Sequence, residues 1–259
     1  MTHTNEETIV REETAVKKKR RRRRKNHLLN LLIVAALGVG AYYWLSSPMF
    51  DVQKIVVENN HHYTKGQIIS MAEAQTGQNI FSTDTGAMKA LLLEDPYIKN
   101  ARVKRSLTDT IVIQVGERKE AACVPYANQF IIIDGEGLVL RKSDIEPRLP
   151  LLVGMTIKTM EDGKPLEVEE TATLTGALGI LDTMENADYY FKKIDISNVV
   201  AKVYIYDQLV CQGIPEHILE SMRNGNLKRV LSDLYTNGIE RGIISVGRSD
   251  YFSFDPMTE

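Results

Sequence analysis

An uncharged, apolar stretch at residues 28–45 constrains this chain more than any other feature, because nine consecutive basic residues stand just before it. Its eighteen residues would span about 27 Å as an α-helix, close to the ~30 Å hydrocarbon core of a bilayer. Tyr42, Tyr43 and Trp44 close the stretch, and such amphipathic rings favour the membrane surface. The pattern predicts a single-pass type II membrane protein, in which the chain after residue 46 lies on the outer side of the cytoplasmic membrane. The basic residues expected to set this topology by staying in the cytoplasm are Lys17, Lys18, Lys19, Arg20, Arg21, Arg22, Arg23, Arg24 and Lys25.

Three other interpretations of this region are open. A cleaved signal peptide has a shorter apolar region, and Pro48 would oppose cleavage after Ser47. A buried core helix is disfavoured by the nine cations beside residues 28–45 together with the lack of any polar face. A basic run can also bind nucleic acid, but next to a membrane span, topology and attraction to anionic lipids explain it more simply. We therefore expect an uncleaved anchor.

The net charge of −2 hides an asymmetry along the chain. Residues 1–27 carry ten Lys/Arg against four Glu, while the chain after the apolar stretch carries 22 Lys/Arg against 30 Asp/Glu, a net of −8. An acidic ectodomain disfavours nucleic acid and favours protein partners. Cys123 and Cys211 lie in apolar, strand-like runs, so we expect two buried, unpaired thiols, although a disulfide is permitted outside the membrane.

The first part of the ectodomain has the pattern of a small α+β unit. A strand at 52–57 ends at the turn signal Asn59-Asn60, and Thr64 and Gln67 have the spacing of a capping box that opens a helix. A second helix at 84–93 stops before Pro96, and strands follow at 98–103 and 110–117. The order β-α-α-β-β predicts two helices on one face of a three-stranded sheet.

The rest of the ectodomain predicts a larger mixed α/β domain with an extended antiparallel sheet, so the fold class is α+β. Its expected elements are a hairpin at 121–126 and 129–133, a turn at 134–137, a linking segment at 147–153, a helix at 167–186, strands at 194–197, 201–206 and 209–212, a helix at 215–235, and a last strand at 242–246. The expected organisation is a basic tail at 1–27, the transmembrane helix at 28–45, a first domain at 50–118, a β domain at 119–247 and a C-terminal tail at 248–259.

This order of elements carries a set of short motifs. They are Phe-Asp-Val-Gln-Lys-Ile-Val-Val at 50–57, Tyr-Thr at 63–64, Asp-Pro-Tyr-Ile-Lys-Asn-Ala-Arg-Val at 95–103, Thr-Ile-Val-Ile-Gln-Val-Gly-Glu-Arg at 110–118, Ile-Asp-Gly-Glu-Gly at 133–137 and Leu-Pro-Leu-Leu-Val-Gly at 149–154. In order and spacing the chain resembles the FtsQ/DivIB family of bacterial division proteins, from residue 17 to about residue 254. The resemblance implies that 50–118 form a POTRA domain. Asn59 stands where the family more often has Gly, but Asn also tolerates a left-handed conformation.

No set of residues in the sequence predicts catalysis. His61 and His62 are adjacent, so in an extended chain they point to opposite sides and do not chelate one ion. The sequence contains no Gly-x-Ser-x-Gly elbow, no His-Glu-x-x-His zinc helix and no phosphate-binding Gly-rich loop. We expect a protein that is not an enzyme and has no cofactor, no metal site and no catalytic residue.

The sequence does suggest a way of binding proteins. An edge strand can accept a partner strand through main-chain hydrogen bonds, and the last strand is followed by the aromatic residues Tyr251, Phe252 and Phe254. The alternative is that Ile244 and Val246 are ordinary core and that the aromatic side chains pack on their own domain. The resemblance implies that partners dock near this strand, and it assigns that role to Ile243, Ile244, Ser245, Val246, Tyr251 and Phe252. The strand at 52–57 is a second candidate edge.

The resemblance therefore implies a divisome scaffold at the septum. It would bind FtsL-like and FtsB/DivIC-like membrane proteins, with septal peptidoglycan synthase components as a further partner class, and would help assemble and regulate septal wall synthesis. One alternative is a POTRA-containing protein of translocation or envelope assembly, although such proteins usually carry several POTRA units before a barrel. A membrane-anchored wall hydrolase is a second alternative, which the missing catalytic set disfavours.

Overall fold

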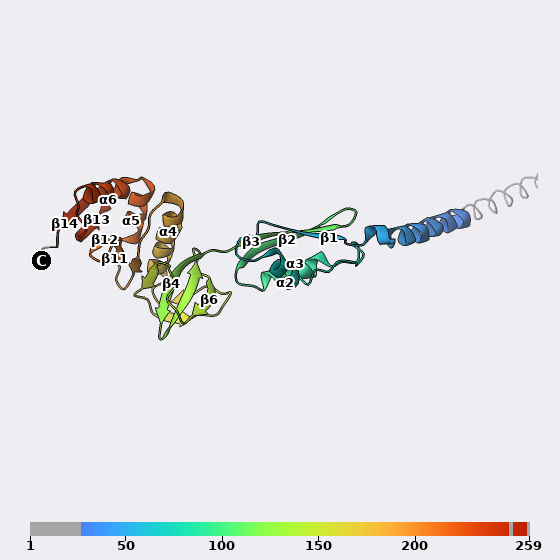
Figure 1. Cartoon of the computed structure of the whole chain (residues 1–259), viewed down its shortest axis with the longest axis horizontal. Helices are drawn as coiled ribbons and strands as arrows, with labels where there is room; N and C mark the ends of the chain where they lie inside the picture. The colour runs from blue at the N-terminus through green and yellow to red at the C-terminus, as the bar shows by residue number, and fades with distance from the viewer. Residues whose placement is uncertain (1–26, 249–250, 258–259) are drawn as a thin grey trace, which may run out of the picture. The chain divides into compact units, whose positions relative to one another are not determined.

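The structure is a computed structural model, which describes residues 27–248 and 251–257 (Figure 1). The apolar stretch forms one continuous helix, His27–Leu45, which is long and apolar enough to cross a membrane and has no part buried in the protein. The helix expected from the sequence is therefore present, as a membrane anchor requires. The basic run at 17–25 lies outside the described residues.

The first domain has the predicted β-α-α-β-β order. Its elements are the short helix η1 (Pro48–Phe50), β1 (Lys54–Glu58), α2 (Lys65–Met71), α3 (Thr85–Leu93), β2 (Ile98–Ser106) and β3 (Thr110–Glu117). The sheet order is β1-β3-β2, so β1 lies at one edge, as expected. The predicted capping box begins α2, because the Thr64 side chain accepts from the Gln67 N–H while the Gln67 side chain accepts from the Thr64 N–H.

The alternating pattern of β3 decides which face of this small sheet is packed. Ile111, Ile113 and Val115 are each almost fully buried, whereas the residues between them remain partly exposed. The two helices bury Ile68 of α2 and Leu92 of α3 completely. The buried side chains of β3 therefore alternate with exposed ones, as the period-two pattern of the strand predicts.

The second domain is built on a nine-stranded sheet with the order β14-β13-β12-β11-β10-β7-β4-β5-β6. The sheet is mixed and not wholly antiparallel, because β7 runs parallel to β4 and β10, and β12 runs parallel to β13. Parallel neighbours need crossover connections. Helices lie in the connections from β7 to β10 and from β12 to β13, whereas β5 and β6 lie in the connection from β4 to β7. The strands are β4 (Glu120–Tyr126), β5 (Gln129–Asp134), β6 (Val139–Ser143), β7 (Leu151–Val153), β10 (Lys193–Asp195), β11 (Ala201–Tyr204), β12 (Leu209–Gly213), β13 (Gly242–Val246) and β14 (Phe252–Asp255).

Three helices pack on one face of this sheet: α4 (Thr171–Ala187), α5 (Pro215–Arg223) and α6 (Asn226–Thr236) (Figure 1). Their apolar side chains share one core with alternate residues of the strands, and this core includes Ile180, Ile218, Leu227 and Ile244. A small separate hairpin, β8 (Ile157–Thr159) and β9 (Glu167–Val168), precedes α4. Both cysteines are free and buried, as expected.

Four segments differ from their expected form. The helix expected at 167–186 begins only at Thr171, because residues 167–168 form β9. The segment at 147–153, expected to be a linker, contributes β7 to the interior of the sheet, where Leu152 is fully buried. The helix expected at 215–235 is two helices, because Gly225 adopts a left-handed conformation between them. Residues 252–255, within the expected tail, form β14 and extend the sheet by one strand.

Candidate partner-binding edge and domain joint

The strand predicted to bind partners lies one position inside the edge of the large sheet. β13 pairs with β12 on one side and antiparallel with β14 on the other, with Ile244 opposite Phe254 and Val246 opposite Phe252. The backbone of β13 is therefore engaged on both sides. The outermost strand at this end is β14, which comes from the aromatic segment after the predicted strand.

The side chains of β13 alternate between core and surface. Ile244 and Val246 belong to the core of the domain, so the alternative interpretation raised from the sequence describes these two side chains correctly. Ile243 and Ser245 lie on the opposite face and are partly exposed, and the Ser245 hydroxyl accepts a hydrogen bond from Gln212. Only this opposite face of β13 can be reached from solvent.

Aromatic residues dominate the outermost strand. The ring of Tyr251 is exposed, whereas Phe252 and Phe254 are half-buried against the core. The Gly247 N–H donates to the Tyr251 carbonyl, so hydrogen-bonded pairs alternate along β14 from that point. By this alternation, the main-chain groups of Phe252 and Phe254 face outward. No strand of the described residues pairs with this side of β14, which is therefore an open edge.

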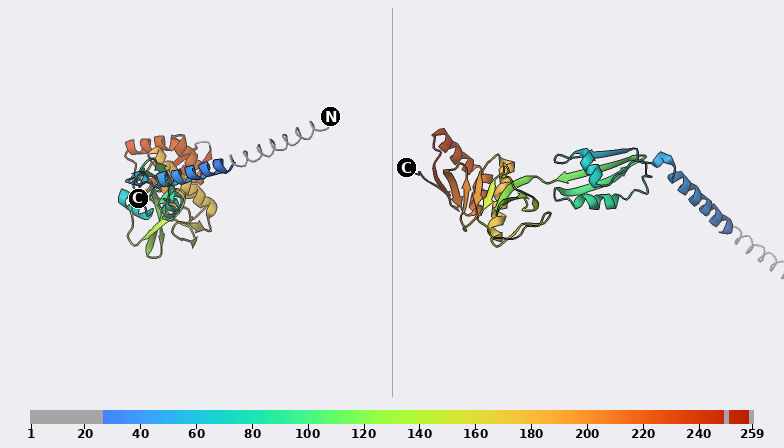
Figure 2. Two further views of the ribbon diagram at one scale, coloured as in Figure 1. Left: turned by 90° about the vertical axis from the view of Figure 1, so that its right-hand side faces the viewer. Right: turned by 60° about the horizontal axis from the view of Figure 1, so that its bottom comes forward.

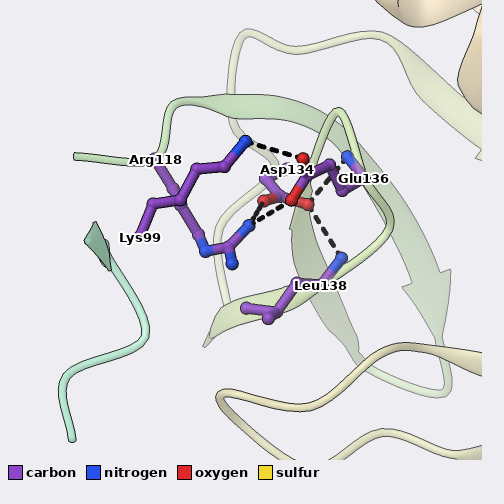
Figure 3. A network of polar contacts seen from close by, with 5 residues as sticks. All are labelled: Lys99, Arg118, Asp134, Glu136 and Leu138. Carbon is purple, nitrogen blue, oxygen red and sulfur yellow. Dashed lines mark hydrogen bonds and ion pairs between the residues drawn. The ribbon is translucent and has the colours of Figure 1, made fainter. Parts of the chain in front are cut away.

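A polar cluster connects the end of β3 with the turn after β5 (Figure 3). Arg118 follows β3, and its Nη1 contacts Asp134 Oδ2 at 2.5 Å and Glu136 Oε2 at 2.7 Å. Lys99 of β2 contacts the other Glu136 oxygen at 2.6 Å. The second Asp134 oxygen accepts the N–H groups of Glu136 and Leu138, so this carboxylate also shapes the turn after β5. We name Lys99, Arg118, Asp134 and Glu136 the domain joint.

The ion pairs of the domain joint differ in how deeply their side chains are buried. Arg118 and Asp134 keep only 15% and 5% of their side-chain surface exposed, whereas Lys99 and Glu136 are about half exposed. Burial alone would lower the Arg118 pKa, but the hydrogen bonds and charges of Glu136 and Asp134 outweigh it and raise that pKa. The Arg118–Asp134 pair is therefore the part of the joint whose loss leaves a buried charge.

An aromatic layer lies beside the domain joint. The Tyr97 hydroxyl donates to Glu120 Oε1 at 2.7 Å, and Arg141 Nε donates to the same oxygen at 2.8 Å. The His62 ring stacks on Tyr97 at 4.0 Å, and Glu117 accepts the N–H groups of the chain at 61–63. Burial first, and then the hydrogen bond to Glu120, raises the Tyr97 pKa to about 12. The hydroxyl therefore keeps its proton and acts as a donor at neutral pH.

The domain joint could not be predicted from the sequence. The local pattern predicts a turn at 134–137 and a strand at 110–117, and nothing local links Arg118 to a carboxylate sixteen positions later. The available signal was compositional: two acidic residues, Asp134 and Glu136, in a turn that follows a buried strand.

Comparison with known proteins agrees with this architecture. Residues 50–118 match the family pattern described as POTRA domain, FtsQ-type. A cell division protein DivIB of Clostridium acetobutylicum is 28% identical over 182 residues, which cover 69% of this chain and 73% of that protein. The likeness therefore extends well beyond the POTRA domain. The chain belongs to the FtsQ/DivIB family of cell division proteins.

Other relatives of the family align over shorter stretches. The cell division protein FtsQ of Syntrophotalea carbinolica is 28% identical over 142 residues, covering 54% of this chain and 49% of that protein. The DivIB of Clostridium tetani is 31% identical over 121 residues, 46% of each chain. FtsQ/DivIB proteins are non-enzymatic membrane division proteins, so the chain is a division protein without a catalytic role, as expected.

Proposed function

We propose that this protein is a divisome scaffold that binds FtsL-like and FtsB/DivIC-like membrane proteins at the open edge of β14. It would thereby help assemble and regulate septal peptidoglycan synthesis, with septal synthase components as a further partner class. The observation that supports this proposal is the outward-facing backbone of Phe252 and Phe254 at the end of a nine-stranded sheet. A partner segment can extend such a sheet by main-chain hydrogen bonds.

The side chains around this edge add specificity to the backbone contact. Tyr251 offers an exposed ring just before the strand, and Ile243 and Ser245 lie on the sheet face that no helix of the described chain covers. Ile244 and Val246 would act indirectly, by holding β13 and so β14 in place. The helix His27–Leu45 keeps the scaffold in the membrane of its partners, which raises their effective concentration.

A pair of variants at Phe254 tests the proposed main-chain contact. Phe254→Pro removes the outward N–H group, whereas Phe254→Ala removes the same ring and keeps that N–H. Full-length variants would be co-expressed with the FtsL-like and FtsB/DivIC-like proteins and recovered in detergent, with circular dichroism to establish folding. The proline variant should lose both partners while the alanine variant retains most of the binding. Wild-type recovery by a folded proline variant would refute strand addition at β14.

A truncation distinguishes addition to β14 from replacement of β14. Removing residues 251–259 leaves β13 as the terminal strand. If partners add to β14, the truncated chain should no longer recover them. If recovery is unchanged or stronger, β14 occupies the position of the partner strand, and the interface moves to β13.

The localisation belongs to the same proposal. A fluorescent fusion of the full-length chain should gather at the division septum, where the partners assemble. A uniform signal around the membrane would count against the divisome role and would favour the alternative of envelope assembly.

A further inference from the structure

A chain of aromatic contacts links the end of the apolar helix to the base of the POTRA domain. The Trp44 ring meets the Phe50 ring edge-on at 5.2 Å, and Phe50 in turn contacts Phe81 at 5.3 Å. The side-chain amide of Asn79 donates to the Leu45 carbonyl at 2.8 Å, which satisfies one of the free carbonyls at the helix end. Only residues 46–49 separate the helix from Phe50, so even fully extended the connection would span only about 15 Å.

The loop that carries Phe81 is held in place by polar contacts. Asn79 Oδ1 accepts the Phe81 N–H at 3.0 Å, and the Ser82 hydroxyl donates back to the Asn79 carbonyl at 2.8 Å. Arg105 crosses from β2 and donates to the carbonyls of Ile80 and Thr83, both at 2.8 Å. With its backbone fixed in this way, the loop presents the Phe81 ring outward, 42% exposed, although Phe50 is buried behind it.

Two further apolar side chains are exposed at the same end of the domain. Met49, in the short helix η1, is 55% exposed, and Leu107 is 66% exposed at the turn between β2 and β3. That turn is tied to the start of β1, because the N–H groups of Gln53 and Lys54 both donate to the Asp109 carbonyl. Figure 2 places the β2–β3 turn at the end of the domain from which the helix leaves.

We propose that Met49, Phe81 and Leu107 form a lipid-contacting base that rests in the headgroup region of the outer leaflet. Apolar side chains exposed together at one end of a domain mark an interaction surface, and the neighbour at this end is the bilayer that holds the helix. The short connection and the Asn79 contact keep this base next to the membrane surface. The base and the helix together would limit tilting of the POTRA domain relative to the membrane surface. This inference rests on the membrane span and is independent of the partners at β14.

Site-specific fluorophores test the lipid contact in the full-length protein. The variants Phe81→Cys and Leu107→Cys would be labelled with an environment-sensitive dye and placed in vesicles of anionic and zwitterionic phospholipid. The two native cysteines are buried, so they need not be removed, and unmutated protein measures any background labelling. Matched controls are Tyr235→Cys, exposed on α6, and Gly40→Cys, within the helix. The quencher is a nitroxide carried by the lipid, either near the headgroup or near the chain end.

The labels at 81 and 107 should be quenched by the headgroup nitroxide and little by the chain-end nitroxide, while the label at 235 is quenched by neither. The label at 40 should respond to the chain-end nitroxide. If the label at 40 is quenched but those at 81 and 107 behave like 235, the span is right and the lipid-contacting base is wrong. If the label at 40 is not quenched either, the helix does not span the bilayer, and the proposed lipid-contacting base is then wrong as well. Shielding of 81 and 107 only after a partner protein is added would mean a protein-docking surface, and would also overturn the lipid contact.

Discussion

Replacing Arg118 with methionine should destabilise the larger domain by about 2–3 kcal/mol, because the change leaves a buried carboxylate without its cation. The Asp134 side chain keeps only 5% of its surface exposed, so water cannot substitute for the lost guanidinium. Two backbone N–H groups still bond to Asp134, which places the expected cost below the usual range for a broken buried pair. Methionine preserves most of the apolar stem of arginine, so the loss reports mainly on charge.

The same joint supplies the control. Lys99 pairs with Glu136 at the surface, where 49% and 57% of the side chains are exposed, so Lys99→Met should cost less than about 1 kcal/mol. Urea unfolding of the full-length protein in detergent, followed by circular dichroism, would measure both. In an Asp134→Asn background, the effect of Arg118→Met should shrink by about 1–2 kcal/mol, because the buried charge is gone. Equal losses for Arg118→Met and Lys99→Met, or no coupling to Asp134→Asn, would refute the reasoning.

Three further predictions follow from other parts of the chain. Gly154→Ala should destabilise the protein by about 2 kcal/mol or more in urea unfolding, since this glycine has φ near +87° and an added Cβ would lie 2.3 Å from a backbone nitrogen. Cys123 and Cys211 should resist maleimide at neutral pH until urea unfolds the domain, because burial raises their pKa values to about 11 and about 12; rapid labelling of the native protein would contradict this. Burial alone would raise the pKa of Glu117 and Glu120, but hydrogen bonds outweigh it and hold both pKa values below the ordinary value. The stability that these carboxylates contribute is therefore complete above the unfolded pKa of about 4.3 and is lost as pH falls through the lower folded value. The protection factors of the amides at 61–63, which correct for the intrinsic pH dependence of hydrogen exchange, should therefore fall only below about pH 4, and a fall already near pH 6 would exclude this cause.

The POTRA domain could be predicted almost completely from the sequence. The capping box at Thr64, the stop before Pro96 and the alternation of Ile111, Ile113 and Val115 are local signals, and each acts within a few residues of the structure it specifies. The larger domain was less predictable. Its parallel pairings depend on which strand the chain reaches after a helix, and no local pattern records that choice.

The candidate binding edge shows the same division. The sequence located the aromatic residues and the strand before them, but it placed the open edge one strand too far inside. Whether Phe252 and Phe254 fold back on β13 depends on the apolar surface available there, which residues from several distant strands and helices create.

The amino-acid order alone determined the helix at 28–45, the predicted direction of its insertion and the POTRA elements after it, because hydrophobic length, flanking charge and short-range periodicity act without reference to the rest of the chain. Three-dimensional packing decided that β7 lies inside the sheet, that β14 forms its outermost strand and that Arg118 meets Asp134. These outcomes depend on contacts between residues far apart in sequence, whose energy exists only when the whole domain has assembled.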